Sequence, residues 1–219
     1  MALRPVYIIE DSLVKKLDIN FKWFAGFSIS QKQKSIESLH EETCKITKIP
    51  KSKIIEISSA SKLKLGINLS AFNLRTKTKT NKIDFSVESA FQSSKVFEHG
   101  GPFKEIINFD SKSAKTDKRL KESGKLLYFE FFGKRYPIED KTAFYDWLYI
   151  NILLKNPKYI KTIMKYRAFS DIMFNPKKSL NTQAFSIALF VCLQLTGIDM
   201  SNFKDYQTFL KESKPFYPN

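Results

Sequence analysis

Cysteine, histidine and glycine are scarce in this chain, which has 2 Cys, 2 His and 7 Gly among its 219 residues. Cys44 and Cys192 lie far apart in the sequence and do not make a disulfide framework. His40 and His99 are too few to build a metal site from histidine and cysteine ligands. We therefore expect neither a metal nor a cofactor, and any catalytic acid or base should be Asp, Glu, Lys or Tyr.

Long hydrophobic runs and nucleotide-binding patterns are also missing. The longest apolar stretch, residues 184–195, is interrupted by Ser186 and Gln194 and is too short to cross a bilayer. The first residues lack the basic and apolar segments of a signal peptide. The chain has no Walker-type phosphate loop and no GxGxxG, HExxH or CxxC pattern. We expect a soluble cytoplasmic protein in a reducing compartment, with no membrane partner.

Positive charge is what the sequence has in excess. Lysine and arginine number 37 against 22 aspartates and glutamates, which gives a formal net charge of +15. The basic residues cluster in residues 75–82, 112–125 and 155–178. A field of this sign attracts polyanions such as nucleic acid or a dinucleotide, although a run such as 75–82 is equally compatible with a solvated loop.

The apolar pattern predicts one mainly α domain that also has a few short strands. A composition of 42% hydrophobic and 14% aromatic residues is that of a globular protein. We expect a single domain over 1–219, with an N-terminal extension at 1–20 and a core at about 21–197. Strands are predicted at 6–10, 54–58 and 125–133. Helices are predicted at 30–46, 87–97, 112–122, 142–154, 158–166, 182–195 and 202–212.

The most informative segment is SVESAFQSSKVFEHGG, residues 86–101. On a helix capped by Ser86, the residues Glu88, Phe91, Gln92 and Lys95 follow the spacing i, i+3, i+4 and i+7 and share one face. A carboxylate, an aromatic ring, an amide and an amine would then lie together. An ordinary helix with an exposed glutamate has the same spacing, so the pattern alone does not define a site.

This segment resembles the signature of the NADAR superfamily, the YbiA-like proteins, which have a serine- or threonine-led helix with the pattern S-E-x-x-F-Q-x-x-K-F. Here it reads S-V-E-S-A-F-Q-S-S-K-V-F, with one extra residue before the glutamate and one before the final phenylalanine. Residues 21–195 as a whole look most similar to the NADAR branch that is paired with DarT-type DNA ADP-ribosyltransferase toxins. The resemblance implies a compact YbiA-like helical domain.

Three further elements carry the resemblance outside this helix. The F-S-N-F element of the family is similar to residues 69–73, which implies substrate contacts by Ser70, Phe72 and Asn73. A tryptophan-bearing helix resembles the segment around Trp147. An acidic loop resembles residues 171–175, although Phe174 stands where the family usually has tryptophan. The family's G-x-N-x-L-G element is replaced by residues 179–184. The resulting binding candidates are Ser70, Phe72, Asn73, Phe91, Gln92, Trp147, Asp171 and Asn181.

The resemblance implies an N-glycosidase or ADP-ribosyl hydrolase that removes ADP-ribose from guanine in DNA. Cleavage of a ribosyl–nitrogen bond develops positive charge at the anomeric carbon, which a carboxylate such as Glu88 stabilises. Glu88 at a helix N-terminus would be favoured as an anion, and it is expected to stabilise charge or to activate water. Lys95 would donate a proton, hold a phosphate, or attack the anomeric carbon to form a Schiff base. Trp147 or Phe72 would stack on a base, although Trp147 also fits ordinary packing.

The implied partners are ADP-ribosylated DNA, single-stranded or duplex, free ADP-ribose and a cognate ADP-ribosyltransferase toxin. The implied role is that of an antitoxin or immunity protein in toxin–antitoxin or anti-phage defence. Two other functions stay open on the sequence. One is an N-glycosidase acting on a small nucleotide, such as a riboflavin-pathway intermediate. The other is a non-catalytic module that binds ADP-ribose, DNA or the toxin.

Overall fold

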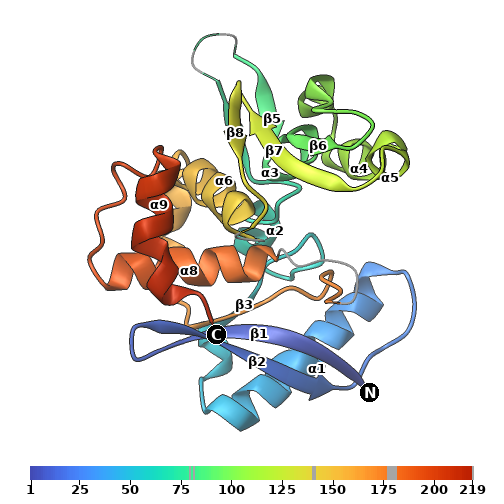
Figure 1. Cartoon of the computed structure of the whole chain (residues 1–219). Coiled ribbons are helices and arrows are strands. Elements are labelled where there is room, and N and C mark those ends of the chain that lie inside the picture. The colour runs from blue at the N-terminus through green and yellow to red at the C-terminus, as the bar shows by residue number, and fades with distance from the viewer. Residues whose placement is uncertain (79, 81, 140–141, 177–181, 219) are drawn as a thin grey trace. The chain divides into compact units, whose positions relative to one another are not determined.

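The computed structural model describes residues 1–78, 80, 82–139, 142–176 and 182–218. The chain forms two compact units, each with its own packed interior. Unit 1 comprises Met1–Ser70 together with Pro157–Asn219, and unit 2 comprises Ala71–Asn156. Figure 1 labels many of the helices and strands of both units.

Unit 1 is built on a four-stranded sheet of order β2-β1-β9-β3. The strands β1 (Ala2–Glu10) and β2 (Leu13–Phe21) form an antiparallel hairpin. The short strand β9 (Ala168–Ser170) pairs antiparallel with β1 and parallel with β3 (Ile54–Glu56). The sheet therefore joins segments from both ends of the chain.

Both faces of this sheet carry helices, which explains why the middle of β1 is buried on both sides. Val6 and Ile8 pack in one cluster with Ile36 and Leu39 of α1 (Ile29–Thr47). The intervening Tyr7 contacts Phe185 of α8 (Gln183–Leu195), with ring centroids 5.4 Å apart. Side chains alternate between the faces of a strand, so α1 and α8 lie on opposite faces. The unit also contains α2 (Lys64–Asn68), α7 (Ile160–Ile163) and α9 (Tyr206–Ser213), and the 3-10 turns η1 (Lys51–Lys53), η3 (Pro157–Tyr159) and η4 (Lys214–Phe216).

Unit 2 combines two small sheets with short helices. The strands β4 (Arg75–Lys77) and β5 (Asp84–Ser86) form a hairpin. The strands β6 (Lys95–Phe97), β7 (Leu126–Phe131) and β8 (Lys134–Tyr136) form an antiparallel sheet of order β6-β7-β8. The helices are α3 (Val87–Ser93), α4 (Ser111–Thr116), α5 (Arg119–Glu122) and α6 (Ala143–Leu154), with the 3-10 turn η2 (Lys104–Asn108).

An aromatic cluster holds unit 2 together. Phe144 of α6 stacks on Phe129 of β7 at 4.5 Å, and Tyr136 of β8 lies 4.8 Å from the same ring. Trp147 packs on Tyr136 at 4.9 Å. Aromatic pairs at these separations add to the stabilisation from burial, so the cluster anchors α6 against the sheet.

The prediction of a mainly α protein is wrong, because the chain has an α+β fold in which the described residues form three sheets. The strand β2 was not predicted because Lys15, Lys16 and Asp18 leave only the short alternation of Leu17, Ile19 and Phe21. Its turn at Asp11 and Ser12 has positive φ angles of 51° and 60° without the usual Asn-Gly pair. Short strands such as β6 and β9 depend on partners distant in sequence.

Several helix boundaries also differ from the prediction. The helix predicted at 87–97 ends at Ser93, and the one predicted at 112–122 divides into α4 and α5. The predicted helix 158–166 is the turn η3 followed by the single turn α7. Among the described residues, no helix is both long and apolar enough to cross a membrane. The single-domain boundaries stay a prediction.

Candidate active site

The helix α3 is fixed at its N-terminus by a closed set of hydrogen bonds. Ser86 is the N-cap, and its hydroxyl accepts from the Ser89 amide while the Ser89 hydroxyl accepts from the Ser86 amide. The next two amides, of Val87 and Glu88, donate to the carbonyls of Leu74 and Ala71 at 3.0 Å. These bonds satisfy the first N–H groups of the helix and fix the position of Glu88.

A serine from α4 ties this N-terminus to the segment that precedes β4. Ser111 Oγ lies 2.7 Å from Ser86 Oγ and 2.8 Å from the carbonyl oxygen of Phe72. Both hydroxyls are buried. The predicted binding residue Phe72 is thereby held next to the start of α3.

Three predicted site residues form a continuous hydrogen-bonded chain. Gln92 donates from Nε2 to Glu88 Oε1 at 2.9 Å, and Lys95 donates from Nζ to Gln92 Oε1 at 2.8 Å. Glu88 is only 6% exposed and Gln92 is 7% exposed. Lys95 is the first residue of β6 rather than a helical residue, yet its side chain reaches back to the face of α3. The structure thus brings a carboxylate, an amide and an amine together.

A second lysine, not singled out in the sequence, completes the arrangement. Lys115 of α4 places Nζ 3.9 Å from Glu88 Oε1 and 5.3 Å from the ring centroid of Phe72. Its side chain is 58% exposed, whereas the Glu88 side chain is 8% exposed. The basic run 112–125 contained the only sequence signal for Lys115, and it indicated charge without position. The Glu88 carboxylate therefore has one buried and one accessible cation near it.

The buried amine of Lys95 is chemically different from a surface lysine. Burial lowers the pKa of Lys95 to about 8; the Glu88 carboxylate opposes this shift, and the Lys115 cation adds to it. Its Nζ also lies 4.7 Å from the ring centroid of Phe91. A pKa of about 8 leaves roughly one amine in ten neutral at pH 7, so Lys95 can act as a proton donor or as a nucleophile.

Two of the three aromatic binding candidates in unit 2, Phe91 and Trp147, belong to its packed interior. Phe91 is 8% exposed and contacts Tyr145 and Phe129 at 5.0 and 5.4 Å. Trp147 is also 8% exposed and packs within the aromatic cluster. The ring of Phe91 nevertheless also faces the amine of Lys95. Trp147 instead contacts the rings of Tyr136 and Phe144, as a packing residue does.

The other predicted site residues lie elsewhere. Ser70 and Asp171 are buried in unit 1, where Ser70 Oγ donates to the Ile67 carbonyl and Asp171 Oδ1 accepts from the amides of Met173 and Phe174. Asn73 is exposed in unit 2. Asn181 lies outside the described residues. Within those residues no group of three or more His, Cys, Asp and Glu side chains has the arrangement of a metal site.

Comparison with protein families identifies the class of protein that carries this site. The sequence profile of the DarT1-associated NADAR antitoxins matches residues 2–217. The chain is therefore a NADAR protein, as the resemblance of residues 86–97 indicated. Within that class it belongs to the DarT1-associated NADAR antitoxin family, which supports an antitoxin role with a DarT toxin as partner. No curated protein sequence matches the chain.

Proposed function

We propose that this protein is an ADP-ribosyl glycohydrolase that removes ADP-ribose from guanine in DNA and thereby acts as an antitoxin. The observation that carries the proposal is the buried chain Glu88–Gln92–Lys95 with Lys115 at its open side. Family membership supports the role, and the chemistry of the side chains supports the reaction.

Glu88 is assigned the stabilisation of positive charge at the anomeric carbon. Departure of guanine leaves a ribosyl centre with oxocarbenium character, and a carboxylate in a buried position interacts with that charge more strongly than one in water. The amide of Gln92 orients one oxygen of Glu88 by a 2.9 Å hydrogen bond. The other oxygen then faces the reacting carbon or an attacking water.

Lys95 is assigned the role of nucleophile, because its lowered pKa provides a neutral amine near physiological pH. Its Nζ forms a bond to the anomeric carbon, and the bond from that carbon to guanine nitrogen breaks. The electron pair leaves with guanine, which takes up the proton that Nζ releases. The ribosyl ring then opens to a Schiff base, and one water hydrolyses it to ADP-ribose and the free lysine.

Lys115 is suited to the phosphates of the substrate. It is the accessible cation of the site, and its Nζ lies near both the carboxylate and the half-buried Phe72. A pyrophosphate or a DNA phosphate provides the negative charge that such a lysine binds. The accessible cation and the buried amine therefore have separate tasks.

The proposal is tested with an oligonucleotide that carries one ADP-ribosylated guanine. We expect wild-type protein to release ADP-ribose, and Glu88→Gln to release it at least about 100-fold more slowly because the isosteric amide lacks the negative charge. Glu122→Gln, an exposed residue of α5, is the matched control and should keep full activity. Equal rates for Glu88→Gln and wild type would refute the assignment of Glu88.

A further inference from the structure

Unit 2 contains a cavity of about 320 Å³ that none of the site residues described above lines. Its walls come from Ile83, the residue just before β5, from the turn η2 and from the β7–β8 hairpin. Ser93 of α3 also lines the cavity. The apolar lining consists of Ile83, Ile107, Phe131 and Phe132, and the polar lining consists of Ser93, Lys104, Glu105, Asn108 and Glu130. Apolar walls with a few polar groups are typical of small-molecule binding sites.

Phe132 gives this cavity an exposed aromatic wall. It is 61% exposed, and its ring centroid lies 4.4 Å from Phe131 and 6.3 Å from Phe85, which support it from behind. It occupies the first position of the β7–β8 turn with a φ of 46°, followed by Gly133 with a φ of 77°. Hairpin turns of this kind usually place Asn, Asp or Gly there, and a bulky residue carries backbone strain.

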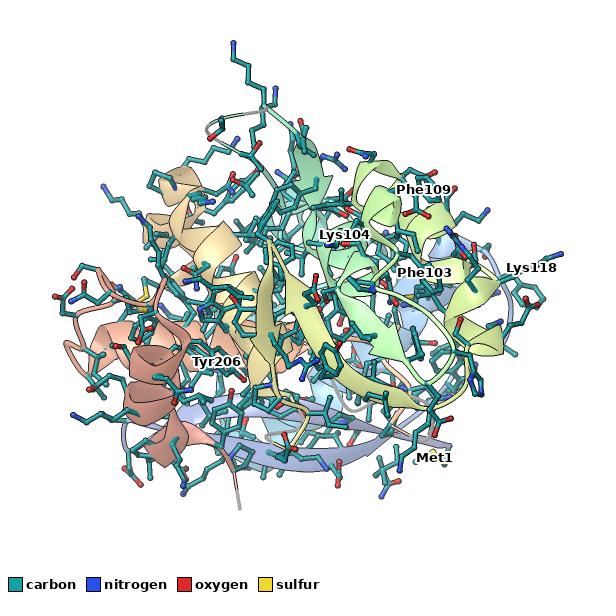
Figure 2. All side chains as sticks on the ribbon, turned by 45° about the horizontal axis from the view of Figure 1, so that its top comes forward. Met1, Phe103, Lys104, Phe109, Lys118 and Tyr206 are labelled. Carbon is teal, nitrogen blue, oxygen red and sulfur yellow. The ribbon has the colours of Figure 1, made fainter. Side chains whose placement is uncertain are left out.

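The charged lining of the cavity consists of one cation, Lys104, and two carboxylates, and Arg135 adds a further cation nearby. The two acidic residues of the lining are already paired, Glu130 with Lys104 at 3.0 Å and Glu105 with Arg119. Lys104 is the first residue of η2, and its side chain is 73% exposed. Figure 2 labels Lys104 next to Phe103. Arg135 of β8 lies directly opposite Glu130 of β7 in the strand register. The two side chains therefore lie on the same face of the sheet.

Arg135 and the β4–β5 hairpin extend this basic rim. The Arg135 guanidinium lies 3.8 Å from the ring centroid of Tyr128. Tyr128 is thus a second aromatic side chain near the cavity, in addition to Phe132. Ile83 of the cavity wall follows Lys82 and belongs to a hairpin that also carries Arg75 and Lys77, both of which pair with Asp84. Phosphates on either side of an inserted base would meet Lys104 and Arg135.

We propose that this cavity receives one nucleobase of the DNA strand that carries the modified guanine, stacked on Phe132, with the adjoining phosphates at Lys104 and Arg135. Aromatic platforms within basic surroundings are the usual means by which proteins hold single-stranded nucleic acid. The polar groups Asn108 and Ser93 can hydrogen-bond the edge of the base. The inference rests on the proposed function for its substrate, but its binding step is independent of hydrolysis.

The helix α3 links this cavity to the candidate active site. Glu88 and Ser93 are five residues apart on the same helix, which is about 7.5 Å along its axis. They point to different sides of the helix, because five residues correspond to roughly 140° of rotation beyond a full turn. The accommodated base is therefore a neighbour of the modified guanine rather than the guanine itself.

The binding step is tested with an unmodified, fluorescently labelled single-stranded oligonucleotide. We expect Phe132→Ala to raise its Kd by about 5- to 30-fold, since a base–aromatic stack is lost. Phe132→Trp should retain the wild-type Kd because it keeps a ring at the same place. Phe27→Ala is the matched control, since Phe27 is fully exposed in unit 1 and should not affect binding. Circular dichroism verifies that each variant is folded.

A second arm uses the ADP-ribosylated oligonucleotide and an ADP-ribosylated mononucleotide as substrates. Phe132→Ala should raise KM for the oligonucleotide and leave KM and kcat for the mononucleotide unchanged. If Phe132→Ala leaves both the Kd and the KM for the oligonucleotide unchanged, the inference is overturned. This holds even if the same variant loses affinity for a DarT toxin, because the surface would then bind protein and not DNA. If no substrate is hydrolysed while the Phe132 effect on binding persists, the proposed function fails and the base pocket stands.

Discussion

At the scale of single residues, the site depends on how a short helix and the strand after it present their side chains. Ser93 and Ser94 donate from their hydroxyls to the carbonyls of Ala90 and Phe91, which competes with continuation of the helix. The chain then turns into β6, and Lys95 pairs with Phe129 of β7. Lys95 therefore lies half-buried at the start of β6, where its amine reaches Gln92, instead of occupying the next turn of the helix.

The pH dependence of catalysis tests the role of Lys95. The pKa of this lysine is lowered to about 8, so the neutral amine increases as pH rises to about 8 and reaches its maximum above that value. We expect kcat/KM to rise roughly tenfold per pH unit between pH 6 and 7.5 and to level off above pH 8. A fall of kcat/KM above pH 8 would assign Lys95 as a proton donor instead.

Chemical trapping provides an independent measurement of the same role. Borohydride added during turnover should reduce the Schiff base and leave a ribosyl adduct on Lys95, detectable by peptide mass spectrometry. Lys95→Met should give no adduct. The exposed Lys121→Met, in α5, is the control and should trap as well as wild type. An adduct on another lysine would contradict the assignment.

The sequence predicted part of this site and missed part of it for a physical reason. Glu88 and Gln92 were predicted together because helical spacing is a local property. Lys95 was predicted to lie beside them on a helix that reaches residue 97, but the helix ends at Ser93. Its contact with Gln92 arises instead because the chain turns into β6 at Lys95. Lys115 and Ser111 reach the site through the packing of α4, a long-range contact that no local spacing encodes.

At the scale of elements, a buried hydrogen-bonded cluster connects one helix and two strands of unit 1. His40 Nε2 of α1 lies 2.8 Å from Ser170 Oγ of β9, and Ser170 Oγ donates to Glu56 Oε2 of β3. Glu56 Oε1 accepts from the amide of Ile172 at 2.8 Å. Glu56 therefore fixes the backbone on both sides of Asp171, and burial raises the pKa of its own carboxyl.

His40 should make stability depend on pH. Burial lowers the pKa of His40 from 6.5 to about 4, with Glu37 opposing and Lys51 adding to the shift. Between pH 6.5 and about pH 4 the histidine of the unfolded chain is protonated while native His40 is still neutral. The contribution of His40 to the free energy of unfolding is therefore complete above pH 6.5 and is lost as the pH falls toward 4. The free energy of unfolding should fall by about 2 kcal/mol from this residue between pH 7.5 and 5.

Urea unfolding of wild type and His40→Gln at both pH values measures this contribution, because titrating groups outside the His40–Ser170–Glu56 cluster cancel in the difference. The wild-type advantage over His40→Gln should shrink by about 2 kcal/mol at pH 5. A difference that is the same at pH 7.5 and pH 5 would show that His40 does not titrate between the native and unfolded states.

The helices were predicted better than the strands. Helices α1 and α8 have side-chain caps at Ser28 and Thr182, and α6 is a long, almost continuously apolar segment. The three-residue strand β9, which was not predicted, exists because it pairs with β1 and β3, each more than a hundred residues away in the chain. Such pairings are set by tertiary structure, and this is why the sequence pattern underestimated the strand content and favoured a mainly α protein.

At the scale of the whole molecule, the excess of positive charge predicts a salt-dependent reaction. The formal net charge is +15. Each phosphate that a lysine or arginine neutralises releases counterions, so about four contacts to a single strand would lower affinity more than tenfold between 50 and 200 mM salt. We expect KM for the modified oligonucleotide to rise at least tenfold over this range, whereas KM for a modified mononucleotide should change far less. Equal salt dependence for both substrates would argue against a DNA-linked substrate.

Family membership extends over residues 2–217 and thus includes both compact units. The site residues that carry the proposed chemistry lie in unit 2, whereas Asp171 and Ser70 are positioned by unit 1. The assignment of catalysis therefore depends on Glu88, Gln92, Lys95 and Lys115, whose mutual contacts all lie within one unit.

The most direct test of the account is the fate of a guanine-ADP-ribosylated oligonucleotide incubated with the wild-type protein and followed by mass spectrometry. We expect the DNA to return to the mass of the unmodified strand while free ADP-ribose appears in equal amount, and we expect Glu88→Gln to slow both changes at least about 100-fold. A modified strand that stays intact with folded wild-type protein would contradict the proposed hydrolysis.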